Sequence, residues 1–169
     1  MRALIVGANG FLAQAVARAA KKEGCDALFG VYHRRKDNIP RAHYRELFAV
    51  DQLFSMGCNF DKIYLLAALI PQQVGEIDRA ALTRANATLP KIFSERYPKS
   101  RIVYASTVSV YPADGLPKDE KSDVSPQNPY AESKREGERI IEAHARHAIV
   151  RLSSLYGPRM RRNTYLPRM

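Results

Sequence analysis

The chain has 169 residues, of which 46% are hydrophobic, and a formal net charge of +10. This length allows one sizeable core and is short for two, so we expect a single domain over residues 1–169. No apolar run approaches the roughly 20 residues of a membrane span, and no signal-peptide pattern opens the chain. These features predict a cytoplasmic protein with no membrane partner.

The positive charge is concentrated towards the two ends of the sequence. Residues 1–50 carry nine basic and four acidic side chains, and residues 151–169 carry five basic and no acidic ones. Basic residues interleaved with aromatic ones, as in a nucleic-acid groove, are missing. Attraction of an anionic small molecule accounts for the first cluster equally well, so we predict no nucleic-acid partner and rank binding through the basic tail third.

Two cysteines, Cys25 and Cys58, are too few for a disulfide framework, and neither lies in a Cys-x-x-Cys or Cys/His cluster. We therefore predict two free, buried or half-buried thiols in a reducing compartment, and no metal site.

The first predicted strand, residues 3–6, runs into a turn with glycine at positions 7 and 10, and residues 12–22 follow with the apolar spacing of a helix. Glycine can bend such a turn and lets backbone N–H groups approach a ligand closely. The helix N-terminus adds unpaired N–H groups and a positive dipole end, and a small residue, Ala13, lets the helix pack on the strand. A plain turn is the alternative, but we predict a pyrophosphate site. Its candidate residues are Gly7, Asn9, Gly10, Phe11 and Leu12.

The second predicted strand, residues 27–31, is followed by basic residues where sites for NAD carry an acidic residue. Arg34 and Arg35 therefore favour NADP weakly over NAD, although a solvated run of charge would look the same. A weaker strand at 47–50 precedes Asp51, which could bind the adenine amino group or simply cap a helix.

Three further apolar runs complete the pattern, at 63–67, 102–105 and 148–152, with helical patterns at 79–97 and 130–147. Strands that alternate with helices form right-handed crossovers and a parallel sheet. We therefore predict an α/β class: a doubly wound parallel sheet of Rossmann type in a three-layer αβα arrangement. The Pro- and Ser-rich stretch 112–129 is predicted to be a surface loop, and loops of this length are often functional.

A candidate acid–base pair lies at the start of the last predicted helix. Tyr130 and Lys134 are one helical turn apart, so an ammonium group can stabilise the phenolate and lower its pKa. The fifth strand ends in the hydroxyl residues Ser106 and Thr107, at the edge where open parallel sheets bind ligands. Thr107 could share a hydrogen bond with Tyr130 and a substrate oxygen. Such a short motif also occurs by chance, so the pair alone does not identify a function. The order of several motifs along the chain is the stronger evidence.

Several motifs appear in one order along nearly the whole chain. They are Gly7-x-x-Gly10-x-x-Ala13, Leu66-Ala67-Ala68, Asn86, Ser106-Thr107 before Val110-Tyr111, Tyr130-x-x-x-Lys134, and Arg151 with Leu155-Tyr156-Gly157-Pro158. With these motifs the chain resembles the extended short-chain dehydrogenases/reductases, specifically the NAD-dependent epimerase/dehydratase group that acts on nucleotide sugars.

The resemblance implies that Tyr130 is the catalytic acid/base, that Lys134 is its partner and that Thr107 orients the substrate. It also implies that Ser106, Ala67 and Ala68 line the nicotinamide side, and that Tyr130 and Lys134 contact the cofactor. The expected function is hydride transfer at a nucleotide sugar or a related alcohol or carbonyl. Dehydration at two sugar carbons is disfavoured, because Val108 and Ser109 stand where the 4,6-dehydratases carry acidic residues.

Members of this family continue into a substrate-binding region, most of which we expect this chain to lack. Two interpretations therefore stay open. One is an NAD(P)-dependent epimerase or reductase, and the other is a catalytically idle NAD(P)-binding module or fragment. The family also pairs its helices across a two-fold axis, so we predict a homodimer through residues 79–97 and 130–147.

Overall fold

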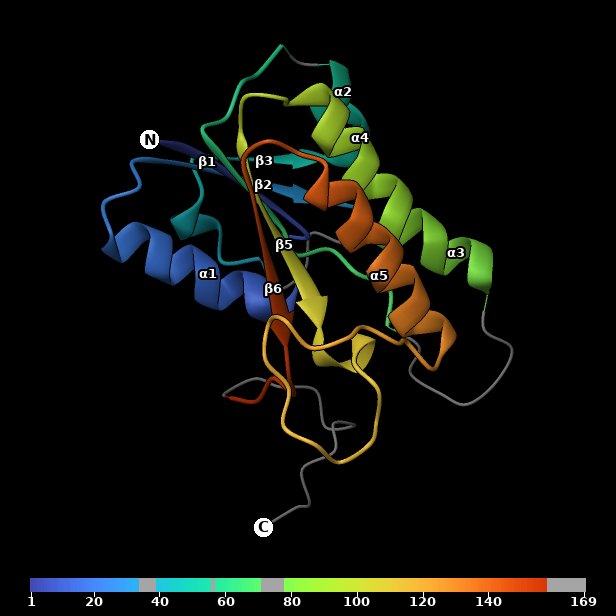
Figure 1. Ribbon diagram of the computed structural model, residues 1–169. Coiled ribbons are helices and arrows are strands. Elements are labelled where there is room, and N and C mark those ends of the chain that lie inside the picture. The colour runs from blue at the N-terminus through green and yellow to red at the C-terminus, as the bar shows by residue number, and fades with distance from the viewer. Residues whose placement is uncertain (34–38, 56, 71–77, 158–169) are drawn as a thin grey trace.

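A single parallel sheet of six strands, in the order β3-β2-β1-β4-β5-β6, forms the centre of the molecule (Figure 1). The computed structural model describes residues 1–169 except 34–38, 56, 71–77 and 158–169. The strands are β1 (Arg2–Val6), β2 (Ala27–Tyr32), β3 (Glu46–Ala49), β4 (Lys62–Leu65), β5 (Arg101–Thr107) and β6 (His147–Leu152). This strand order is that of the dinucleotide-binding doubly wound fold, so the predicted fold class is confirmed.

Helices cover both faces of the sheet and complete the three layers (Figure 1). They are α1 (Phe11–Lys22), α2 (Val50–Ser55), α3 (Arg79–Thr83), α4 (Leu89–Arg96) and α5 (Pro129–Glu142). On one face, α1 buries Ala13, Ala17 and Ala20, and these small residues let it lie close to the strands. On the other face, Phe93 of α4 and Ile141 of α5 belong to a second apolar cluster. Each face of the sheet therefore has its own core.

The chain changes direction across the sheet at β1, which pairs with β2 on one side and with β4 on the other. Val6 lies beside Val31 and Leu65, so the carboxyl ends of these strands meet at one edge. In open α/β sheets, ligands bind in the crevice outside this point. The fold thus places the predicted glycine turn at the position where a binding site is expected.

Several predicted strands and helices end at other residues in the structure than the sequence predicted. The run at 63–67 is strand only as far as Leu65, and the helical pattern at 130–147 ends at Glu142. His147 belongs to β6 because it pairs with Ile102 of β5, and this pairing decides where the helix must end. The pattern at 79–97 is helical but contains a π-helical turn at Arg84–Thr88 between α3 and α4.

Within the described ranges, no helix is long and apolar enough to cross a membrane. Cys25 is a buried free thiol and Cys58 a half-buried one, as predicted. The same part of the chain contains no group of three or more His, Cys, Asp or Glu residues that could hold a metal ion.

Gly137 allows α5 to lie directly against the π-helical turn and β5. A Cβ atom at this position would overlap with the carbonyl oxygen of Asn86 and the hydroxyl group of Tyr104. These two atoms are hydrogen-bonded to each other at 2.7 Å, and both are buried. Neither can move away cheaply, because a buried carbonyl that loses its donor keeps the cost of desolvation.

We therefore expect Gly137→Ala to lower the free energy of unfolding by about 1–3 kcal/mol, the usual cost of overpacking. Urea denaturation measures this change. Gly57→Ala is the matched control, since a Cβ there meets no atom within 4 Å, and it should change stability by less than about 0.5 kcal/mol. Equal stability of the two variants would contradict the close approach.

Candidate active site

The turn between β1 and α1 presents backbone N–H groups at the carboxyl edge of the sheet. Gly7 has φ +91°, a conformation that favours glycine, and the N–H groups of Gly7 and Ala8 both donate to the Val31 carbonyl at 2.9 Å. Gly10 precedes α1 as its N-cap and provides no side-chain hydrogen bond to the helix. Gly10 therefore leaves the first N–H groups of α1 without a side-chain cap. The positive end of the helix dipole lies at the same end of α1.

The segment after β4 closes tightly against this turn. A Cβ atom at Gly7 would lie 2.8 Å from both the nitrogen and the Cα atom of Ala67. The N–H of Leu66 donates to the Val6 carbonyl at 3.1 Å. Ala67 is half-buried, and Ala68, Asn9 and Gly10 are exposed. The structure therefore brings these two groups of predicted cofactor residues to the same place.

The Thr107 side chain lies beside Tyr130, whose pKa it lowers, and its hydroxyl also donates to the Ser109 hydroxyl at 3.2 Å. Thr107 is the last residue of β5, and Tyr130 lies in the first turn of α5. The Asn128 side chain caps this helix by accepting a hydrogen bond from the Ala131 N–H at 2.9 Å. Burial raises the pKa of Tyr130, and the contact with Thr107 lowers it in part. The capped helix and the end of β5 thus hold two predicted catalytic residues in contact.

Lys134 lies one turn further along α5 and is only 1% exposed. Its Nζ atom has no hydrogen-bond partner among the residues that the structure describes. It lies 4.0 Å from the centre of the Tyr104 ring, and cations are attracted to aromatic faces. Burial lowers the pKa of Lys134 to about 7, although the negative charge of Glu138 acts in the opposite direction. A buried amine without an acceptor is costly, and such groups are typical of ligand sites.

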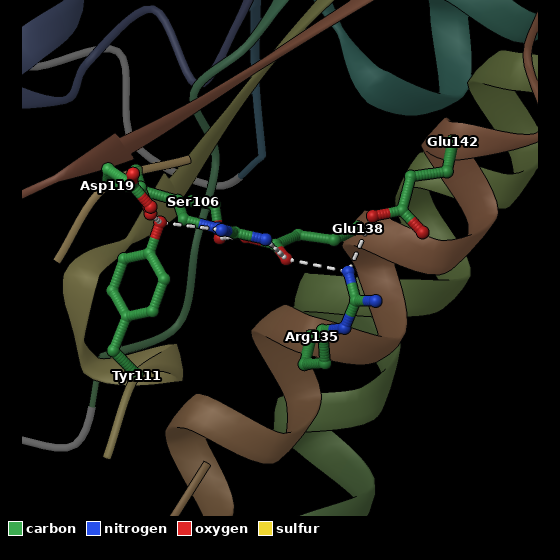
Figure 2. A network of polar contacts seen from close by, with 7 residues as sticks. Ser106, Tyr111, Asp119, Arg135, Glu138 and Glu142 are labelled. Atoms are coloured by element: carbon green, nitrogen blue, oxygen red, sulfur yellow. Dashed lines mark hydrogen bonds and ion pairs between the residues drawn. The ribbon is translucent and has the colours of Figure 1, made fainter. Parts of the chain in front are cut away.

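Ser106 points to a buried polar network (Figure 2). Its hydroxyl donates to Glu138 at 2.5 Å, and Glu138 is completely buried. Arg151 donates to the same carboxylate twice, through Nε and Nη2, each at 2.9 Å. Arg135 donates to it at 3.0 Å. Burial raises the pKa of Glu138, but the hydrogen bonds from Arg151 and Ser106 outweigh this effect and leave it below its ordinary value.

This network also reaches the loop after β5. Arg151 Nη1 donates to the Tyr111 hydroxyl at 2.7 Å, and that hydroxyl donates to the Asp119 carbonyl at 2.8 Å. Glu138 was not among the site residues predicted from the sequence. The spacing of four residues between Lys134 and Glu138 could have identified it, because residues at this spacing share a helix face.

Asn86 holds the segment after β4 to the helix layer. Its side chain accepts from the Leu69 N–H at 3.1 Å and donates to the Leu69 carbonyl at 3.2 Å and to the Ser133 hydroxyl at 2.9 Å. It lies in the π-helical turn and is completely buried. π-Helical turns are frequent at functional sites, and this one fixes the end of the β4 segment beside α5.

The remaining predicted site residues within the described structure lie at the starts of α1 and α2. Phe11 is 36% exposed at the start of α1, and Leu12 behind it is half-buried. Asp51 lies in the first turn of α2 and is exposed, directly after the carboxyl end of β3. Arg34 and Arg35 lie outside the described residues. The assignments of these residues to a cofactor stay predictions.

The residues present suit a dinucleotide. The glycine turn leaves space for a diphosphate, since a Cβ at Gly10 would meet only the Gly7 carbonyl oxygen, at 3.1 Å. One helical turn from Tyr130, the Lys134 Nζ has no partner among the described residues and would gain acceptors from a ribose. A ligand that bound both would place its far end next to Tyr130.

Similarity to known proteins identifies the family of the chain. The profile of the NAD dependent epimerase/dehydratase family matches residues 3–169. Methionine adenosyltransferase 2 subunit beta of Danio rerio is 29% identical over 160 residues, which are 92% of this chain and 48% of that protein. UDP-glucuronic acid 4-epimerase of Bacillus cereus, solved with NAD, aligns with a TM-score of 0.81 at 24% identity, over 97% of this chain and 60% of that one.

A hypothetical dTDP-4-dehydrorhamnose reductase of Sulfolobus tokodaii also has the same fold, with a TM-score of 0.75 at 23% identity over 90% of this chain and 56% of that one. The chain thus spans between 48% and 60% of the length of these three proteins. Because the family profile covers nearly the whole sequence, the chain belongs to the NAD dependent epimerase/dehydratase family.

Proposed function

We propose that this chain binds a nicotinamide dinucleotide in the crevice above β1 and β4 and supports hydride transfer at a nucleotide sugar or a related alcohol or carbonyl. The observation that carries this proposal is the Lys134 amine, which is buried without a hydrogen-bond partner in the described structure, one turn from Tyr130. Structures of the B. cereus UDP-glucuronic acid 4-epimerase contain NAD and UDP-glucuronic acid, and this ligand pair is the starting point for the substrate class.

The bound cofactor would supply the hydride acceptor or donor. The chain's own residues would bind and orient it: the glycine turn and the α1 N-terminus on the diphosphate, and Lys134 on the nicotinamide ribose. Tyr130 would take the proton from a sugar hydroxyl as the carbon gives up its hydride, and return it in the reverse direction. Thr107, which lies beside Tyr130, would hold the same oxygen.

Both NAD and NADP remain candidate cofactors. The comparison structure contains NAD, whereas Arg34 and Arg35 favour NADP weakly by their charge. The cytoplasmic location and the homodimer through the α3–α4 and α5 helices also belong to this proposal. Analytical ultracentrifugation tests the dimer, which a monomer at high micromolar concentration would contradict.

A second candidate function is an idle NAD(P)-binding partner of another enzyme. The Danio rerio relative, at 29% identity, is named as a subunit of methionine adenosyltransferase. This candidate predicts cofactor binding without turnover, so the two candidates differ in activity and agree in binding.

We expect isothermal titration calorimetry to detect binding of NAD⁺ or NADP⁺, and Gly10→Ala to weaken it about tenfold, equivalent to about 1.4 kcal/mol. The added methyl group would occupy the space of the diphosphate. The backbone at Gly10, with φ −74°, suits alanine, and the Gly7 carbonyl oxygen, 3.1 Å from the new Cβ, would shift by a few tenths of an ångström. Gly57→Ala serves as the control and should bind like the original chain. If neither dinucleotide binds at millimolar concentration, the proposal is wrong.

Tyr130→Phe should lower kcat about 100-fold or more, because the acid–base group is lost, while the dissociation constant of the cofactor stays nearly unchanged. Nicotinamide absorbance with a panel of nucleotide sugars measures the rate. Tyr64→Phe, a change on β4 away from Lys134, is the control. Binding without turnover in the original chain would favour the idle partner over the enzyme.

Lys134→Met should raise the thermal unfolding temperature, because it removes a buried amine that the fold holds at a cost. The pKa of this group falls from 10.5 to about 7 on folding, so the unfolded chain binds more protons between these values and Lys134 destabilises the fold most below about pH 7. The gain in stability should therefore be largest below about pH 7 and shrink towards pH 10.5. Thermal unfolding across this range tests it, and a loss of stability at every pH would contradict it.

A further inference from the structure

The Glu138 carboxylate is buried and accepts hydrogen bonds at both of its oxygens. Its two oxygens accept four hydrogen bonds, from Ser106, from Arg135 and twice from Arg151. The side chain has no exposed surface, whereas Glu142, the other carboxylate bonded to Arg135, is 43% exposed. Burying a carboxylate costs free energy unless its oxygens are paired in this way. The fold therefore stabilises a buried negative charge at position 138.

The position of this charge relates it to the acid–base pair. Glu138 lies one helical turn after Lys134 and two turns after Tyr130, on the same buried side of α5. Its partner Ser106 directly precedes Thr107 on β5. A single carboxylate thus joins the helix that carries Tyr130 and Lys134 to the strand that carries Thr107.

We propose that Glu138 is a positioning residue that acts through Lys134, by fixing α5 against β5 and by placing a buried negative charge one helical turn from the Lys134 amine. The role of Glu138 in catalysis rests on the proposed function. The effect of Glu138 on Lys134 is a property of the chain without cofactor or substrate.

The surroundings of Lys134 support this assignment. The Tyr104 ring of β5 lies 4.0 Å from its amine, and Tyr130 and Glu138 lie one helical turn before and after Lys134 on its own helix. Both tyrosines have raised pKa values because they are buried, so they are neutral near pH 7. Glu138 is the charged group that raises the pKa of Lys134 against the effect of burial. Without it, the amine would lose its proton at a lower pH and could no longer stabilise a Tyr130 phenolate.

A second link connects the network to the loop that precedes α5. Arg151, held by Glu138, bonds to Tyr111, and Tyr111 bonds to the backbone of Asp119 (Figure 2). The Ser125 N–H donates to the Val110 carbonyl at 2.9 Å. The loop is thus hydrogen-bonded both at Asp119 and at Ser125. The same carboxylate that fixes the acid–base pair therefore also fixes the loop beside it.

The test is ¹⁵N NMR of the lysine side chains, with the Lys134 signal assigned by its loss in Lys134→Met. In Glu138→Gln the titration midpoint of Lys134 should fall by about 1 pH unit, the usual effect of removing a nearby opposite charge. In Glu142→Gln it should stay unchanged, because this carboxylate shares Arg135 but lies on the exposed side. Glu138→Asp, which keeps the charge, should restore most of the midpoint.

Removing Glu138 alone leaves the Arg151 charge without its partner and can prevent folding. Glu138→Gln/Arg151→Met removes both charges and is the variant to use in that case, with a smaller fall of the midpoint expected, because the loss of the Arg151 charge acts in the opposite direction. An unchanged Lys134 midpoint in a folded Glu138 variant would overturn the proposal. Calorimetry with NAD⁺ on the original chain distinguishes this outcome from failure of the proposed function, since the titration of Lys134 does not depend on cofactor binding.

Discussion

The contact between Gly7 and Ala67 is the constraint on which the site depends. At the centre of the sheet, the turn after β1 and the segment after β4 meet backbone to backbone, at a distance that leaves no room for a Cβ atom on Gly7. This contact places the uncapped start of α1 beside the carboxyl ends of the central strands. Any side chain at position 7 would separate these segments.

The other half of the site depends on how closely α5 packs. Gly137 has no Cβ atom, and a Cβ at this position would overlap with Asn86 and Tyr104. Lys134 is buried by the same approach, and its amine faces the Tyr104 ring instead of water. The structure thus holds an amine whose pKa is near neutrality, which is unfavourable for stability and favourable for acid–base chemistry.

Glu138 offsets part of this cost. Its carboxylate receives hydrogen bonds from β5, β6 and α5, so it stays ionised although it is completely buried. The strands and helices that form the two ends of the predicted site, the diphosphate end and the acid–base end, are therefore stabilised by different means. Close backbone packing fixes the first, and a buried polar network fixes the second.

The sequence by itself determined the fold class, the glycine turn and the Tyr130–Lys134 pair, because these follow from local patterns: apolar runs, glycine spacing and residues one helical turn apart. It also placed Thr107 at the end of a strand, and the structure brings this residue to Tyr130. It did not determine where helix 130–147 ends or that Ser106 turns towards Glu138. Those features depend on the pairing of β6 with β5 and on a carboxylate, a strand and an arginine that are up to 45 residues apart in the sequence (Ser106 to Arg151). Only the tertiary structure decides such contacts, because the burial that makes an ion pair or an unpartnered amine significant exists only after distant segments have packed together.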